Sequence, residues 1–333
     1  MPWRTKGFRV ADAIRIGLPR SMLYHKYHVL WSTFFEELGC ETVVSPPTNK
    51  RLLERGAALS VDESCLSMKI FLGHIEALHD RADYVLVPTI ASLYPHEDAC
   101  VKLMGAYDIT RHSVEGVSLL TYVVDERRSI SEKREMLRLG RKFCRNPLRV
   151  RAAYRRARLN LRAHERELAR EQQSLVEAPW DRPRILLVGH AYNLADEFIG
   201  APIERFLESL GVTVFDSEAL DHGVARDLYS RISTDVKWTY NKQLLGAVEY
   251  YRDKVDGMVF LVAFPCGPDS LMVELCQRRV KDVPIATLVV DELSSETGLR
   301  TRLESFVDIL RMSGAKGCDT SPPSERGVLH GTA

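Results

Sequence analysis

The feature that most constrains the fold is a repeated alternation of short apolar runs with amphipathic helical stretches. Residues 84–87 and 258–262 are continuously apolar, which is typical of strands buried on both faces of a parallel sheet. Further strands are expected at 14–18, 41–45, 119–124, 185–188, 212–215 and 285–290. Apolar residues recur at helical spacing in 21–38, 64–79, 203–210, 269–280 and 297–312. This alternation predicts right-handed βαβ units and a parallel sheet with helices on both faces.

One segment, residues 131–177, interrupts the alternation. It is rich in Arg and Glu, and its single proline, Pro147, predicts a break. Beyond this break the apolar residues recur at helical spacing, and arginines occupy the opposite face: Val150, Tyr154, Ala157, Leu161 and Leu168 against Arg151, Arg155, Arg158, Arg162 and Arg166. We interpret the segment as a helical connector with a solvated charged face, since glutamates are interleaved with the arginines. Binding of RNA or acidic lipid to this face is the weaker alternative.

The fold class predicted from these patterns is α/β, with two Rossmann-like or flavodoxin-like parallel-sheet domains joined by a long helical connector. We expect an N-terminal α/β domain over residues 1–128, the connector over 129–180 and a C-terminal α/β domain over 181–312. Residues 313–333 contain Gly, Ser, Pro and Asp, a composition that predicts a disordered tail.

Charge and cysteine content narrow the class of protein. The formal net charge of +1 gives no overall attraction to nucleic acid or membrane. No apolar run is long enough to span a membrane, and the first residues lack the apolar core of a signal peptide, so a cytoplasmic protein is expected. Seven cysteines, an odd number without a CxxC pair, argue against a disulfide scaffold and a zinc ribbon. They stand at positions 40, 65, 100, 144, 266, 276 and 318.

Three of these cysteines fall where ligands gather in parallel sheets, near the carboxyl ends of strands. Cys266 follows the strand at 258–264, Cys65 begins the helix at 64–79, and Cys100 lies in the segment after 84–87. A helix N-terminus favours a thiolate, which is the form that binds metal. The pattern alone leaves a second interpretation open, because free cysteine is often a buried core residue.

Polar residues follow the same strand ends. His190, Tyr192 and Asn193 come after the strand 185–188, and Asp269 and Ser270 come directly after Cys266. They are candidates for catalysis or substrate binding, although Asp269 or Ser270 could instead cap its helix, and Tyr192 and Asn193 could close a turn. Asp291 and Glu292, after the strand 285–290, are expected to cap a helix or to pair with Arg300 or Arg302.

At these positions the sequence resembles the 2-hydroxyacyl-CoA dehydratase and benzoyl-CoA reductase superfamily, in the branch labelled acyl-CoA dehydratase activase-related. The resemblance rests chiefly on Val61-Asp62-Glu63-Ser64-Cys65-Leu66 and Phe264-Pro265-Cys266-Gly267-Pro268-Asp269-Ser270. It extends over about residues 14–312, with further matches at 16–24, 45–50, 189–193, 291–292 and 298–304. The sequence departs from the branch at Val101, Ala191 and Leu293, where proline, proline and histidine are usual.

The resemblance implies a [4Fe-4S] cluster held by Cys65, Cys100 and Cys266, with a fourth iron open to a substrate oxygen. It implies a protein like the D component of 2-hydroxyglutaryl-CoA dehydratase. Such a protein accepts an electron from a separate ATP-dependent iron–sulfur activator of sugar-kinase-like fold and uses it on an acyl-CoA. This chain contains no phosphate-binding loop of its own. The resemblance also implies a homodimer, or a heterodimer with a related subunit.

Asp269, Ser270 and His190 are the predicted catalytic residues beside this cluster, and Tyr192 and Asn193 are predicted to contact the substrate. Two alternatives stay open. The chain could be a non-catalytic iron–sulfur electron carrier or scaffold subunit, as the departures at Ala191 and Leu293 would suit. It could also be a metal-free α/β binding module whose cysteines belong to the core.

Overall fold

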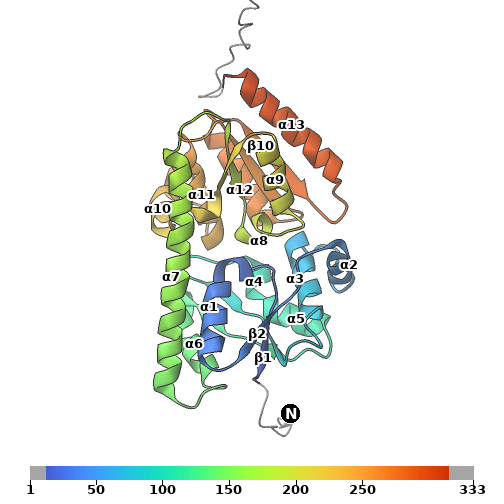
Figure 1. Cartoon of the computed structure of the whole chain (residues 1–333), viewed down its shortest axis with the longest axis vertical. Helices are drawn as coiled ribbons and strands as arrows, with labels where there is room; N and C mark the ends of the chain where they lie inside the picture. The colour runs from blue at the N-terminus through green and yellow to red at the C-terminus, as the bar shows by residue number, and fades with distance from the viewer. Residues whose placement is uncertain (1–12, 315–333) are drawn as a thin grey trace, which may run out of the picture.

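Two four-stranded parallel sheets, one in each half of the chain, organise the structure (Figure 1). The computed structural model describes residues 13–314. The first sheet has the order β2-β1-β3-β5 and the second has the order β10-β9-β7-β8. The strands are β1 (Arg15–Leu18), β2 (Glu41–Val44), β3 (Tyr84–Leu86), β5 (Leu119–Leu120), β7 (Arg184–Val188), β8 (Thr213–Asp216), β9 (Gly257–Ala263) and β10 (Ile285–Val290). The predicted α/β class is therefore confirmed.

The two sheets share one topology. Counted within each half, the strands lie in the order 2-1-3-4, which is the arrangement of a flavodoxin-like doubly wound sheet. The order reverses between β1 and β3 in the first sheet and between β7 and β9 in the second. The crevice above such a reversal, at the carboxyl ends of the strands, is where doubly wound proteins bind ligands.

The single strand expected at 119–124 is divided into β5 and β6 (Val123–Asp125). Its neighbour is divided in the same way into β3 and β4 (Thr89–Ser92), and β4 pairs with β6 as a separate two-stranded parallel sheet. Pro88 lies between β3 and β4 and has no N–H to donate to the ladder, which accounts for the interruption.

The predicted helices form with ends shifted by a few residues, and additional helices lie between them. The predicted ones are α1 (Tyr24–Glu37), α3 (Leu66–Glu76), α9 (Gly200–Ser209), α12 (Gly267–Arg279) and α13 (Glu296–Met312). The sequence patterns did not reveal α2 (Lys50–Ala58), α4 (Val101–Met104), α5 (Ala106–Ser113), α8 (Ala191–Leu194), α10 (His222–Leu228) and α11 (Thr239–Tyr251).

The connector consists of α6 (Glu132–Gly140) and the 31-residue α7 (Pro147–Glu177), separated near Pro147 as expected. At about 1.5 Å per residue α7 is roughly 46 Å long, and it runs along both halves (Figure 1). Arg149 near its start donates to the carbonyl of Glu37, and Gln172 near its end donates to the carbonyl of Asp216 at 3.0 Å. Leu168 was wrongly assigned to the packed face, since it is 41% exposed.

The carboxyl edges of the two sheets face each other, and apolar side chains pack across the boundary. Tyr240 of α11 is buried in the core of the first half. Leu66 and Ile70 of α3 belong to the same buried cluster as Ile185 and Leu187 of β7. Residues Leu66–Ile75 of α3 are all buried, so this helix lies between the two halves rather than on a surface.

The predicted disordered tail lies almost entirely outside the described residues, which end at 314. Within the described part of the chain, no helix has both the length and the apolar character needed to cross a membrane.

Candidate functional site

Each of the three predicted cysteine ligands occupies the same structural position, the N-cap of a helix. Cys65 precedes α3, Cys100 precedes α4 and Cys266 precedes α12. All three have extended backbone conformations, as N-cap residues do. Pro268 in the first turn of α12 suits a helix start, because the N–H that proline lacks would have no partner there.

The structure brings the segments that carry these cysteines together. The backbone N–H of Leu66, next to Cys65, donates to the carbonyl of Phe264 at 2.9 Å, which joins the Cys65 and Cys266 segments across the two halves. Lys102 Nζ donates to Ser64 Oγ at 3.4 Å and joins the Cys100 and Cys65 segments. Tyr192 lies close enough to all three thiols for each of them to raise the pKa of its hydroxyl.

Burial dominates the acid–base behaviour of the three thiols. It raises the pKa of Cys65 and of Cys266, and it raises the pKa of Cys100 to about 11. None of the three thiols accepts a capping hydrogen bond. The backbone N–H three residues further along each helix, at Met68, Leu103 and Asp269, nevertheless lowers the thiol pKa and offsets part of the effect of burial. The thiols are therefore protonated when no cation is near.

The remaining cysteines lie elsewhere, as expected. Cys40 and Cys276 are buried in apolar clusters. Cys144 is half-buried in the loop before α7, where it packs against the core of the first half and its thiol donates to the carbonyl of Asn146 at 3.8 Å. Cys318 lies outside the described residues.

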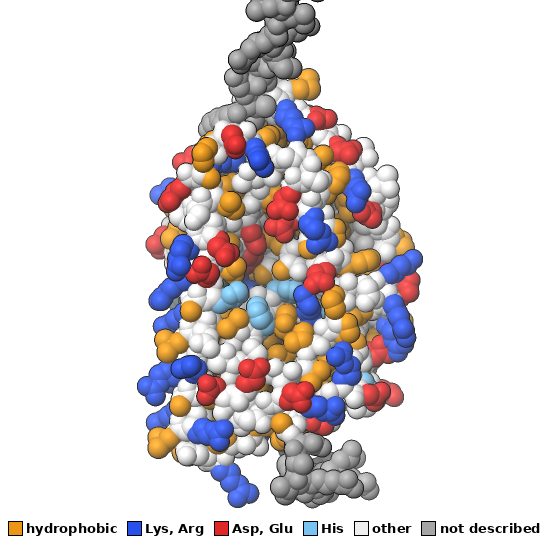
Figure 2. Space-filling model, viewed as in Figure 1, with side chains coloured by type: hydrophobic (Ala, Val, Ile, Leu, Met, Phe, Trp, Pro, Cys, Tyr) orange, Lys and Arg blue, Asp and Glu red, His pale blue; other side chains and the backbone are white. Residues whose placement is uncertain are grey.

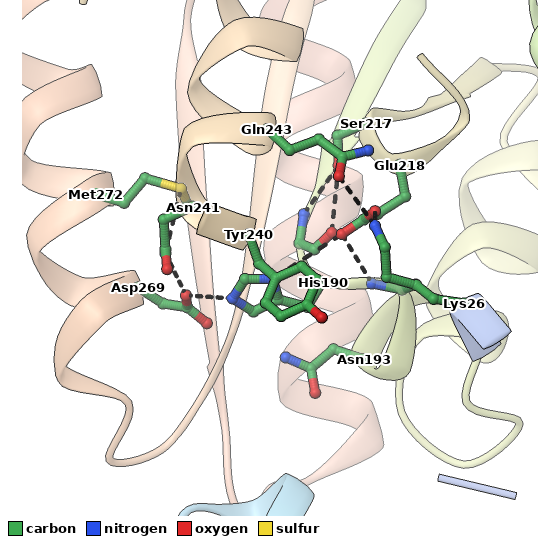
Figure 3. A network of polar contacts seen from close by, with 12 residues as sticks. Lys26, His190, Asn193, Ser217, Glu218, Tyr240, Asn241, Gln243, Asp269 and Met272 are labelled. Atoms are coloured by element: carbon green, nitrogen blue, oxygen red, sulfur yellow. Dashed lines mark hydrogen bonds and ion pairs between the residues drawn. The ribbon is translucent and has the colours of Figure 1, made fainter. Parts of the chain in front are cut away.

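His190 and Asp269, two of the predicted catalytic residues, form a buried ion pair, and Asp269 also contacts the Cys266 thiol (Figure 3). Nε2 of His190 lies 2.9 Å from Oδ1 of Asp269, and Asn241 Nδ2 donates to the same oxygen at 2.8 Å. Burial lowers the pKa of His190, but the Asp269 carboxylate outweighs that effect and the net shift is upward. For Asp269 burial raises the pKa, whereas His190, Asn241 and Cys266 together hold it below its usual value.

These contacts rule out the interpretation of Asp269 or Ser270 as the cap of its helix. The carboxylate of Asp269 is used by His190 and Asn241, and the N-cap of α12 is Cys266, so neither Asp269 nor Ser270 is the cap. Ser270 donates its hydroxyl to the Cys266 carbonyl at 2.8 Å. Its catalytic role stays a prediction.

Tyr192 and Asn193 form α8 just after His190. The ring of Tyr192 stacks on that of His190, with centroids 4.9 Å apart. Ser67 donates to Asn193 Oδ1 at 2.7 Å, and Asn193 Nδ2 is buried without a hydrogen-bond partner among the described residues. Both side chains thus lie next to the cysteines, and the amide of Asn193 retains an unused donor.

The sequence patterns missed several residues of this network. Glu218 follows β8 and lies 3.9 Å from Nδ1 of His190; it also contacts Lys26 of α1, which is 3.0 Å from Gln243 (Figure 3). Asn241 and Gln243 lie on the unpredicted α11. Three consecutive buried polar residues on a helix, Asn241, Lys242 and Gln243, give no periodic signal.

Asp291 and Glu292 do not contact the arginines that were considered for them. Asp291 accepts from the N–H of Leu293 at 2.9 Å and closes its own loop. Glu292 pairs with Lys69 of α3 at 2.6 Å. A lone lysine in the apolar run of α3 was the available signal for this contact.

No group of three or more His, Cys, Asp or Glu in residues 13–314 could hold a single metal ion. In an iron–sulfur cubane each thiolate binds a different iron, so the ligands are spaced more widely than those of one ion.

Comparisons with solved structures return distant matches. They include ZnuA (10% identity, TM-score 0.24, covering 90% of this chain and 98% of that chain). A mutant of the Mn-bound periplasmic metal binding protein from Candidatus Liberibacter asiaticus has 12% identity, TM-score 0.22 and coverages of 90% and 100%. A FpvC mutant from Pseudomonas aeruginosa has 14% identity, TM-score 0.25 and coverages of 90% and 100%. Similarity this low supports no conclusion about function.

No curated protein matches the chain. A family model does: residues 15–220 match the family described as "CoA enzyme activase uncharacterised domain". The matched region includes Cys65, Cys100, His190 and Tyr192, and it covers more than half of the 333 residues. The chain therefore belongs to this CoA enzyme activase family.

Proposed function

We propose that Cys65, Cys100 and Cys266 hold a [4Fe-4S] cluster and that the protein serves electron transfer to an acyl-CoA or a related small molecule. In this proposal the electron comes from an ATP-dependent iron–sulfur activator. The observation that carries the proposal is the convergence of three cysteines, each at a helix N-terminus, near one half-buried tyrosine, Tyr192. Membership of a family described by CoA enzyme activation is consistent with it.

The donor set fits such a cluster. Thiolates select iron–sulfur clusters over hard cations such as Mg²⁺ or Ca²⁺. The raised thiol pKa values mean that binding must release protons, which makes metal uptake pH-dependent. When bound, a cluster with three thiolate ligands supplies one-electron chemistry and one iron open to a substrate oxygen.

The chain's own residues would orient the ligands and the substrate. Asp269 interacts with the Cys266 thiol and is itself fixed by His190 and Asn241, an arrangement typical of the outer residues of metal sites. Burial keeps the pKa of Tyr192 well above its usual value, so its hydroxyl remains a neutral donor among the three thiols. The free amide donor of Asn193 could bind a substrate carbonyl.

An associated subunit is also part of the proposal. Large apolar side chains next to the cysteines in sequence are exposed: Val61, Val101, Phe264 and Leu271. Phe264 is 53% exposed and Val101 is 74% exposed, which is costly beside a redox centre unless a partner covers them. A second copy, a related subunit or the activator would do so. The free thiols suit a reducing cytoplasm.

The decisive experiment is anaerobic purification followed by iron and sulfide analysis. The wild type should be brown and should contain about four irons per chain, as a cubane requires. Cys65→Ala and Cys266→Ala should lose the colour and most of the iron. Cys144→Ala is the matched control, because this half-buried cysteine lies outside the site and should leave the iron content unchanged. An iron-free wild-type preparation would overturn the proposal.

The same preparation distinguishes the enzyme from a carrier or scaffold. A subunit that acts on acyl-CoA should show a change in the reduced-cluster spectrum when an acyl-CoA is added. A carrier should hold the cluster without any such response. The departures at Ala191 and Leu293 are the features that favour the carrier, and Leu293 is 86% exposed.

A further inference from the structure

In the part of the chain that the structure describes, a groove between α6 and α7 is lined by five cations and by no carboxylate. It encloses about 670 Å³, and its polar lining consists of Tyr154 together with five cations: Lys133, Arg151, Arg155, Arg158 and Arg162. Figure 2 shows Lys and Arg side chains following the side of the molecule along which α7 runs. The interleaved glutamates of α7 do not line this groove.

The cations of the groove are largely unpaired. Within residues 13–314, the side chains of Lys133, Arg151, Arg155 and Arg162 form no ion pair or hydrogen bond, whereas Arg158 lies 3.5 Å from Glu132. Glu165 is close enough to attract both Arg158 and Arg162, so Lys133, Arg151 and Arg155 are the cations farthest from any carboxylate partner. Two arginines elsewhere on α7, Arg149 and Arg170, do have partners. Arg170, for example, lies 2.8 Å from Glu167. The groove therefore concentrates positive charge that an anion would relieve.

The groove opens into a second cavity between the two halves. This interdomain cleft encloses about 450 Å³ and shares Lys133, Tyr154 and Arg158 with the groove. Two of its lining groups, Thr239 Oγ1 and Gln243 Nε2, are buried without a hydrogen-bond partner among the described residues. Gln243 is only 4% exposed, so water does not replace the missing partner readily.

We propose that the α6–α7 groove binds the phosphate groups of a small molecule whose uncharged arm extends into the interdomain cleft. Arginine forms charge-assisted hydrogen bonds with phosphate oxygens, and several on one helix face can bind more than one phosphate group. Carbonyl or hydroxyl groups on the arm would pair with Thr239 and Gln243. A CoA ester has both the phosphate groups and the uncharged arm, and in naming it the inference rests on the proposed function. Inorganic pyrophosphate has the phosphate groups alone.

Calorimetric titration of the anaerobically purified full chain tests the groove, with coenzyme A and inorganic pyrophosphate as probes. Both should bind the wild type, and the double variant Arg155→Gln/Arg162→Gln should weaken both by about tenfold or more, equivalent to about 1.4 kcal/mol. Arg156→Gln is the matched control, since Arg156 is exposed on the same helix but does not line the groove. Failure of both probes to bind, or equal losses in the control, would overturn the proposal.

Thr239→Val tests the cleft separately. It should weaken coenzyme A several-fold and leave pyrophosphate binding unchanged, because only the longer probe reaches the cleft. An unchanged affinity for coenzyme A would refute the second half of the proposal. Iron content measured on the same samples tests the cluster separately from the groove. Protein that retains iron but binds neither probe would contradict the proposed groove and leave the proposed cluster standing.

Discussion

Replacing Asp269 by alanine should be the most destabilising single change near the three cysteines. Asp269 and His190 are 2% and 4% exposed, so the substitution leaves an imidazolium and the amide of Asn241 buried without their shared acceptor. Removing one partner of a buried ion pair costs about 3–5 kcal/mol. An unsatisfied buried amide costs about 1–3 kcal/mol, but the two effects overlap, so we expect a loss of about 4 kcal/mol.

The pH dependence of this loss follows from the two pKa shifts. His190 has a raised pKa in the folded protein, so its contribution is complete below its unfolded value of about 6.5 and disappears as pH rises through the folded pKa. Asp269 has a lowered pKa, so its contribution is complete above about 3.9 and disappears as pH falls through the folded pKa. The difference between wild type and variant should therefore be greatest between about pH 4 and 6.5.

Urea unfolding of iron-free protein at pH 6, followed by circular dichroism, measures the effect without any contribution from a bound group. Glu274→Ala is the matched control, because Glu274 pairs with Arg278 on the same helix, α12, at an exposed site and should change stability by less than about 1 kcal/mol. A double-mutant cycle with His190→Leu should show strong coupling. If Asp269→Ala costs no more than the control, the pair is not a buried ion pair and the reasoning fails.

Two other predictions concern residues that position the same elements. His74 should remain neutral, because burial lowers its pKa to about 3. Its Nδ1 lies 2.7 Å from Ser45 Oγ and its Nε2 lies 2.9 Å from Thr48 Oγ1; because Thr48 donates its own hydrogen to Asp196 at 2.6 Å, we expect the ring hydrogen on Nε2. A titration midpoint near pH 6.5 in the NMR signals of the His74 ring would contradict this. Gly56→Ala should destabilise the protein by about 1–3 kcal/mol in thermal unfolding, because the added Cβ would lie 1.8 Å from the Lys69 carbonyl oxygen. Gly298→Ala is the control: this glycine is exposed and has space around it, so the substitution should be neutral or stabilising.

The strands and the positions of the three cysteines could be predicted because both depend on local sequence. Continuous apolar runs mark buried parallel strands, and Cys266 adjoins the helix start that follows such a strand, β9. Cys65 adjoins the start of α3, a helix that its apolar residues predicted. Helices with uneven apolar spacing could not be predicted. Nearly all of α11 is buried, polar residues included, so it has no solvent-facing stripe to reveal it.

The partners of polar residues were the least predictable part of the site. His190 and Asp269 are 79 residues apart, and Lys69 and Glu292 are 223 apart, so no spacing rule connects them. Each contact depends on how the two halves pack against each other, and that packing is a property of the whole fold. The expectation that Glu292 pairs with Arg300 or Arg302 was wrong for this reason, since it considered only neighbours in sequence.

The position of Cys65 relative to Cys266 depends on α3, which contacts the second half through Ser67 and Lys69 as well as Leu66. Lys69→Met keeps most of the side-chain volume but removes the ion pair with Glu292, which is partly exposed and can be solvated when alone. Stability should therefore change by about 1 kcal/mol or less. If the cysteines bind a cluster, loss of this ion pair should let α3 shift. The variant should then release iron to a chelator about 10–100-fold more readily, as when outer-sphere contacts of metal sites are removed. Lys50→Met, which breaks the exposed pair with Glu54, is the control. Equal iron retention in the two variants would show that α3 does not set the geometry of the cysteines.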